Sequence, residues 1–109
     1  MFRPNMCCEV EPEKEWKMSP IEIEREAINR WGTEKQLFMV FEEMSELQKE
    51  ICKFIRGKNN KIAIAEEIAD VQIMLEQLQI MCGIQNAEIA HHYEMKMDRL
   101  QKRLRGEQE

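Results

Sequence analysis

The chain has few of the residues that interrupt or cross-link a polypeptide. Its 109 residues include only 3 prolines, 4 glycines and 2 histidines, and its aromatic content is 6%. The 4 cysteines contain no C-x-x-C pair, which excludes the usual zinc patterns, and nothing favours a disulfide framework. Cys52 and Cys82 fall in apolar helical stretches, so we expect them to be reduced residues of the core.

Long apolar runs are also missing. None approaches the ~20 residues needed to cross a membrane, and the N-terminus has no uninterrupted apolar stretch of the secretory kind. The net charge is -5, from 21 acidic and 16 basic residues, which argues against a general nucleic-acid-binding surface. These absences predict a cytoplasmic protein that binds neither membranes nor nucleic acid.

Helical periodicity begins at Ile21. Residues 1–20 hold all 3 prolines among charged residues, which predicts a flexible leader in which Met18 is a candidate alternative start. No alternating pattern of strand length competes with the helical one. We therefore predict an all-α domain over residues 21–106, followed by a C-terminal tail at 107–109.

Glycines and capping residues divide this domain into helices. Four are expected, over residues 21–31, 33–56, 61–82 and 86–105. The signals are Gly32, Gly57, Gly83 and Gly106 at helix ends, a capping box of Thr33 with Gln36, and Asn59 or Asn60 and then Asn86 as caps.

The third of these helices is apolar on more than one side. Ile64 and Leu75 lie opposite Ile73 and Ile80, and a helix of this kind is usually buried on several sides. Helices from one short chain would not easily cover it. We expect four to five helices per chain in an oligomeric helical bundle, as a homodimer or homotetramer.

Two acidic segments lie where amphipathic helices should be apolar. Residues 42–46 read Glu-Glu-Met-Ser-Glu, and residues 66–70 read Glu-Glu-Ile-Ala-Asp. In each of the pairs Glu43/Glu46 and Glu67/Asp70, spacing of three residues places both carboxylates on one helix face. The short turn between the helices predicts an antiparallel helix hairpin that brings the pairs together.

Most glutamates on helices are solvated, and those near the chain ends fit that description. Four convergent carboxylates on apolar stripes do not, because burying them requires a cation or hydrogen bonds. An oxygen-only ligand set is typical of Mg²⁺, with Mn²⁺ as a substitute. The spacing therefore predicts a Mg²⁺ site.

The sequence resembles the MazG-like nucleoside triphosphate pyrophosphohydrolases of the all-α NTP pyrophosphatase superfamily. The resemblance covers roughly residues 21–104 and rests on E-E-x-x-E followed by E-x-x-D on consecutive helices. It implies Mg²⁺-dependent hydrolysis of a (deoxy)nucleoside triphosphate between the α- and β-phosphates, giving the monophosphate and pyrophosphate in nucleotide-pool housekeeping. Other matching residues are Trp31-Gly32, Gln36, Arg56-Gly57 and Lys96-x-x-Arg99.

The resemblance also implies roles for the acidic residues. Glu42 would assist catalysis by orienting water or a second metal, and Glu66 would be peripheral. The residues that would hold Mg²⁺ and form the rest of the catalytic set are Glu43, Glu46, Glu67 and Asp70.

A triphosphate substrate also requires positive charge at the rim and a slot for the base. Gln36 could read a base edge through its amide, and Trp31 suits either the slot or the core. The phosphate-binding candidates are Lys53 and Arg56, with Lys58 and Lys61, near the turn, and Lys96 and Arg99, with Arg103, on the last helix. The base-binding candidates are Trp31, Gln36 and Phe38.

Two other interpretations compete with a pyrophosphohydrolase. A non-catalytic oligomeric helical binding module could use the 9 methionines as an adaptable surface. Glu88-Ile89-Ala90-His91 has the E-x-x-H spacing of a di-iron carboxylate bundle, but such bundles require two of these motifs. A third interpretation, a family member that binds nucleotides without hydrolysing them well, is disfavoured because all four predicted metal ligands are present.

Overall fold

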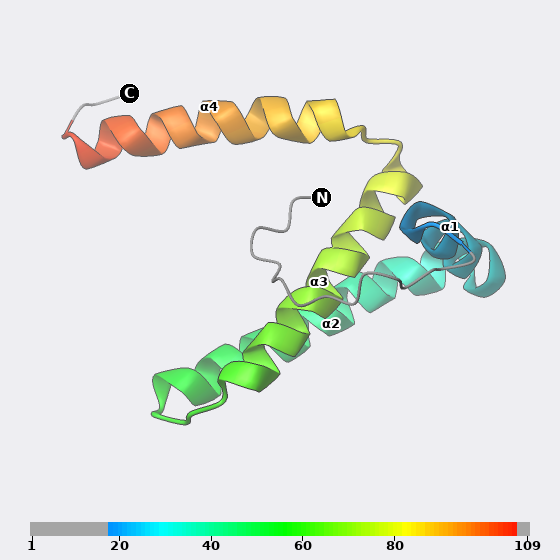
Figure 1. Ribbon diagram of the computed structural model, residues 1–109, viewed down its shortest axis with the longest axis horizontal. Helices are drawn as coiled ribbons and strands as arrows, with labels where there is room; N and C mark the ends of the chain where they lie inside the picture. The colour runs from blue at the N-terminus through cyan, green and yellow to red at the C-terminus, as the bar shows by residue number, and fades with distance from the viewer. Residues whose placement is uncertain (1–17, 107–109) are drawn as a thin grey trace.

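The structure is a computed structural model that describes residues 18–106. All regular structure in this range is helical, which confirms the prediction of an all-α chain (Figure 1). Within the described range, no helix combines the length and the apolar character needed to span a membrane. The four helices are α1 (Pro20–Trp31), α2 (Thr33–Ile55), α3 (Lys61–Cys82) and α4 (Asn86–Leu104).

The start of α1 lies one residue before the expected position. Pro20 occupies the first turn, where its missing N–H costs nothing. The Ser19 backbone N–H donates to the Glu22 carboxylate over 2.9 Å, and the Glu22 N–H donates to the Ser19 hydroxyl over 3.3 Å. This reciprocal pair is a capping box that the sequence analysis missed.

The predicted capping box of Thr33 with Gln36 is wrong. Gly32 is the N-cap of α2, and no side chain caps it. Gln36 is instead buried, and its Nε2 donates to Oε1 of Gln77 on α3 over 2.8 Å. A buried amide of this kind requires a partner, and the facing helix supplies it better than the helix end.

The other two capping predictions are partly wrong. Asn60 is the N-cap of α3, but its amide donates to Glu50 on α2 and makes no capping bond. The N-cap of α4 is Gln85 and not Asn86, and the Gln85 N–H donates to the Glu88 carboxylate over 3.0 Å. The end of α3 is as expected, because Gly83 takes the left-handed φ of +71°.

Helices α2 and α3 lie side by side and run in opposite directions (Figure 1). Gln36 near the start of α2 meets Gln77 near the end of α3, while Glu50 near the end of α2 meets Asn60 before α3. Helix α1 packs against both, and no Cα atom of α4 comes within 8 Å of α1, α2 or α3. We refer to α2 and α3 together as the α2–α3 pair.

The apolar core of the described residues is small. Val40 and Met74, each 6% exposed, are its buried apolar residues. Cys52 and Cys82 were expected in the core but are exposed, because the packing among the four described helices leaves them uncovered. The predicted helices therefore form, while most of their apolar surface is not buried by the residues between 18 and 106.

Replacing Gln36 with Leu is expected to lower the free energy of unfolding by about 1–3 kcal/mol, because the amide of Gln77 would be left buried without its partner. The double variant Gln36→Leu/Gln77→Leu should recover most of that loss, since both polar groups are removed together. Urea unfolding of the two variants measures the difference. Equal losses in both would show that the amide–amide bond is not the cause.

Candidate functional site

Three carboxylates from two helices converge on the α2–α3 pair. Glu43 on α2 and Glu67 and Asp70 on α3 each offer an oxygen, and these oxygens lie within 4.8 Å of one another. Glu43 and Glu67 are half-buried, and Asp70 is exposed. Between residues 18 and 106 this is the one cluster of three or more potential metal ligands.

The electrostatics of this cluster reflect its lack of positive charge. Burial raises the pKa of Glu43, and the negative charges of Asp70 and Glu67 raise it further. Burial is also the main reason that the pKa of Glu67 is raised, followed by the charges of Asp70 and Glu46. A bound cation would favour the ionised form of each group and reverse these shifts.

One oxygen of Glu67 lacks any compensating interaction. Its Oε1 is buried from solvent and has no hydrogen-bond partner. Buried polar atoms are nearly always paired, so an orphaned carboxylate oxygen beside two further carboxylates indicates a missing partner. The oxygen-only donor set and this unpaired atom fit a hard divalent cation such as Mg²⁺.

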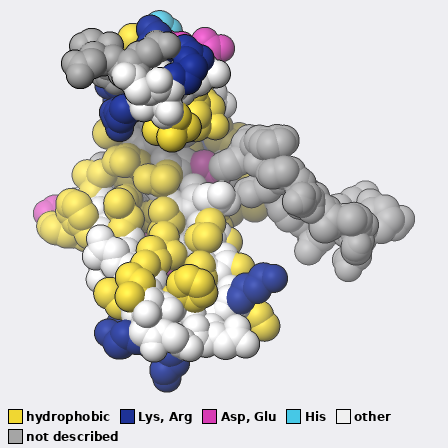
Figure 2. All heavy atoms as spheres, turned by 90° about the vertical axis from the view of Figure 1, so that its left-hand side faces the viewer, with side chains coloured by type: hydrophobic (Ala, Val, Ile, Leu, Met, Phe, Trp, Pro, Cys, Tyr) yellow, Lys and Arg dark blue, Asp and Glu magenta, His cyan; other side chains and the backbone are white. Residues whose placement is uncertain are grey.

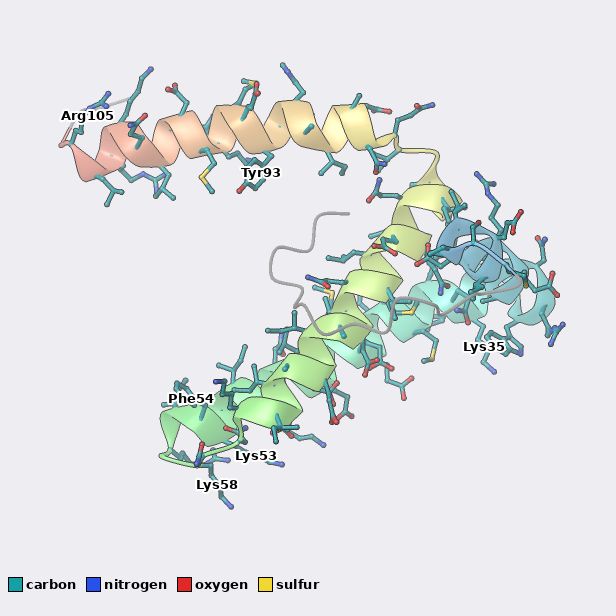
Figure 3. The ribbon with its side chains drawn as sticks, in the orientation of Figure 1. Lys35, Lys53, Phe54, Lys58, Tyr93 and Arg105 are labelled. Carbon is teal, nitrogen blue, oxygen red and sulfur yellow. The ribbon has the colours of Figure 1, made fainter. Side chains whose placement is uncertain are left out.

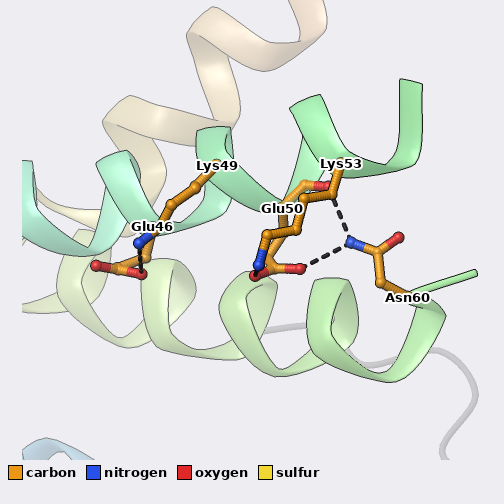
Figure 4. Close-up of polar contacts among 5 residues, drawn as sticks. All are labelled: Glu46, Lys49, Glu50, Lys53 and Asn60. Carbon is orange, nitrogen blue, oxygen red and sulfur yellow. Dashed lines mark hydrogen bonds and ion pairs between the residues drawn. The ribbon is translucent and has the colours of Figure 1, made fainter. Parts of the chain in front are cut away.

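Glu46, the fourth predicted ligand, points elsewhere. Its Oε1 lies 3.5 Å from Nζ of Lys49, one turn along α2 (Figure 4). An ion pair between exposed side chains contributes little, so it would exchange readily for a stronger cation. The structure thus brings together three of the four predicted ligands.

The remaining acidic residues of the two segments surround the cluster. Glu42 and Glu66 are exposed. The charge of Glu42 contributes to the raised pKa of Glu43, and that of Glu66 contributes to the raised pKa of Glu67. Both lie within electrostatic range of the convergent carboxylates and outside the group itself.

Glu50 is an acidic residue at this site that the sequence analysis missed. Its Oε1 accepts from Nδ2 of Asn60 over 2.7 Å, and its Oε2 accepts from Nζ of Lys53 over 3.2 Å (Figure 4). The bond from Asn60 is the largest cause of the lowered pKa of Glu50, followed by that from Lys53. The available signal was its position four residues after Glu46, on the same face of α2.

The predicted phosphate-binding residues do not converge on the cluster within one chain. Lys53 is paired with Glu50, and Arg56 is the C-cap of α2. Figure 3 shows Lys53 and Lys58 near the turn that joins α2 to α3. Lys96 and Arg99 lie on α4, no Cα atom of which comes within 8 Å of the α2–α3 pair.

The predicted base-binding residues also differ in their surroundings. Trp31 is exposed, so its alternative assignment to the core is wrong. Phe38 is exposed as well, and its ring centroid lies 6.3 Å from that of Phe41. The amide of Gln36 is already engaged by Gln77, which leaves two aromatic rings available for stacking.

A second acidic pair, also missed from the sequence, joins α1 to α3. Glu24 is only 7% exposed and shares a hydrogen bond with Glu76. Burial first, and then the hydrogen bond and charge of Glu76, raise the pKa of Glu24 to about 8. The signal was the position of Glu24 in line with Ala27 and Ile28, on the face of α1 that meets the other helices.

Comparisons with known proteins identify no relative of the chain. The scan against family models, the search of curated proteins and the search of solved structures each returned no match.

Proposed function

We propose that the protein is a Mg²⁺-dependent nucleoside triphosphate pyrophosphohydrolase of the MazG-like kind. The observation that carries the proposal is the convergence of Glu43, Glu67 and Asp70 around the unpaired Oε1 of Glu67. The order and spacing of the acidic segments, which resemble those of that family, supply the reaction. The products would be the nucleoside monophosphate and pyrophosphate.

Each residue near the cluster has a defined role in this proposal. Glu43, Glu67 and Asp70 supply ligand oxygens, and Glu46 completes the set by leaving Lys49. Glu42 would orient the attacking water. Bound Mg²⁺ would neutralise charge on the phosphates and would lower the pKa of the attacking water.

Substrate binding requires groups outside the cluster. Because the acidic groups repel a triphosphate, positive charge from Lys53, Arg56, Lys96 and Arg99 would neutralise the phosphates. Trp31 and Phe38 would stack on the base. We also propose that the protein is a homodimer or homotetramer, because two buried apolar residues are too few to stabilise a domain of this length.

A pyrophosphate-release assay with a panel of ribo- and deoxyribonucleoside triphosphates tests the proposal. We expect Mg²⁺-dependent formation of monophosphate and pyrophosphate from at least one substrate, with Mn²⁺ as a weaker or equal substitute. Release of orthophosphate would contradict cleavage between the α- and β-phosphates. No turnover of any nucleotide would favour the second candidate function.

That second candidate is a non-catalytic helical binding module. The exposed methionines Met44, Met95 and Met97 favour it, since flexible thioether side chains adapt to varied partners. A thermal shift separates the two functions, because only the metal site predicts stabilisation by Mg²⁺ alone.

A further inference from the structure

Helix α4 carries a continuous apolar stripe. The stripe residues recur at intervals of three or four, so they share one face of the helix. All of them are exposed, from 44% for Leu100 to 81% for Leu104. The stripe consists of Ile89, Tyr93, Met97, Leu100 and Leu104.

Helices α1, α2 and α3 do not cover this stripe. Helix α4 has 19 residues and meets another helix at its first residue, where Nε2 of Gln79 on α3 donates to Oδ1 of Asn86 over 2.9 Å; no Cα atom of α4 lies within 8 Å of α1, α2 or α3. In proteins, most of the stability of a helix comes from the packing of its apolar face and not from intrinsic helix propensity. A covering surface is therefore required for α4 to be stable.

The α2–α3 pair also presents an apolar surface on its side toward α4. Tyr93 lies on the side of α4 toward that pair, and Phe54 lies on the side of the pair toward α4 (Figure 3). Figure 2 shows hydrophobic side chains on the underside of α4 and over the surface below it, with a hollow between them. The exposed apolar residues of the pair include Phe41, Ile51, Phe54, Ile55, Ile62 and Ile73.

The end of α4 and the acidic segments of the α2–α3 pair carry opposite net charge. Residues 95–105, at the end of α4 and its C-cap, include five basic residues and one acidic residue. The acidic segments at 42–50 and 66–70 together include seven acidic residues and one lysine. A second copy of the chain carries both surfaces, so two copies can exchange these contacts symmetrically, as in a two-fold dimer.

The apolar area is sufficient for a stable dimer. Large side chains exposed to these extents contribute on the order of 80–100 Å² each. The five stripe residues and a similar number on the α2–α3 pair would bury about 800 Å² per partner, which is the size of a standard specific interface. A small rim contact would not reach that area.

We propose that the stripe of α4 packs on the α2–α3 pair of a second copy of this chain, whose own α4 packs in return. The resulting two-fold assembly covers the apolar surface that one chain leaves exposed. It rests on the homo-oligomer proposed above and does not depend on nucleotide hydrolysis.

Leu100→Glu and Met95→Glu form a matched pair for testing this interface. Both place a carboxylate at an exposed apolar position of α4, but Met95 lies on the opposite face from the stripe. By light scattering at micromolar concentration, we expect the wild type and Met95→Glu to be dimeric or larger. Leu100→Glu should raise the dissociation constant of the dimer at least tenfold. If this variant keeps the wild-type assembly, the proposal is overturned.

Hydrogen exchange of the unmodified protein gives an independent test in case Leu100→Glu fails to fold. We expect the α4 amides to be protected in concentrated samples and to lose that protection at least tenfold on dilution into the monomer range. An oligomer whose α4 amides exchange freely would overturn the interface proposed for α4. The proposal that the protein is a homo-oligomer would still stand. Protected α4 amides in a strict monomer would overturn it too, because the cover would then come from the same chain.

Discussion

Glu67→Gln is expected to reduce Mg²⁺-dependent pyrophosphate release by a factor of ~10² to 10³, the usual cost of removing one group that stabilises a charged transition state. Among the described residues, Glu67 contributes the one buried carboxylate oxygen that has no hydrogen-bond partner. An amide in its place keeps the shape but removes the negative charge that a cation requires. Asp70→Asn should behave similarly, because its carboxylate belongs to the same group of three.

The melting temperature of Glu67→Gln shows whether the variant loses activity because it loses a metal ligand or because it no longer folds. Without metal, its melting temperature should equal or exceed that of the wild type, because repulsion with Asp70 and Glu46 is removed. Mg²⁺ should raise the melting temperature of the wild type and leave that of the variant unchanged. Glu34→Gln, at an exposed position of α2, is the control and should retain both activity and the Mg²⁺ response.

Glu24→Gln is expected to make the protein more stable than the wild type above pH 8 and about equally stable near pH 5. Glu24 and Glu76 share a hydrogen bond, so one of the two carboxyls must hold a proton. Among the charged groups of the described helices, Glu76 is the one that acts on the pKa of Glu24. A glutamine at position 24 donates its own N–H to Glu76 and needs no proton.

The sign of this effect follows from proton binding. The folded chain binds the Glu24 proton more tightly than the unfolded chain, because the pKa of Glu24 rises from 4.5 to about 8 on folding. This contribution to stability is complete below pH 4.5 and is lost as the pH rises toward 8. At about 1.4 kcal/mol per unit, the loss reaches up to roughly 5 kcal/mol.

Melting curves followed by circular dichroism between pH 5 and pH 9 measure this effect. The wild type should lose at least ~10 °C over that interval, and Glu24→Gln should lose much less. Glu26→Gln is the matched control, because Glu26 lies on the same helix but is exposed and paired with Arg30 at 3.0 Å. Parallel pH profiles for the wild type and Glu24→Gln would contradict the shared proton.

The sequence predicted the helices well because their signals are local. Glycine at positions 32, 57 and 83 ends a helix by a conformational preference that no distant residue can easily override. The convergence of Glu43 with Glu67 and Asp70 was also predictable, since it requires only helical spacing and a short connection. These features depend on residues close together in the sequence.

The errors arose where distant residues compete for the same group. Gln36 could cap its own helix, but Gln77 offers a buried partner that only the packed helices bring near. In the same way, the amide of Asn60 donates to Glu50 on α2 and does not cap α3. Glu24 shows the converse error, because glutamate usually lies on the surface and only the packing of α1 buries it.

The Gln36–Gln77 bond also determines which residues face one another along α2 and α3. Sliding one helix past the other by a single turn would shift them by about 5.4 Å and leave two buried amides unpaired. The Glu50–Asn60 bond imposes the same alignment from the other end. Glu43 meets Glu67 and Asp70 between these two fixed points, so the register of the acidic cluster is set by polar contacts that bind no ligand themselves.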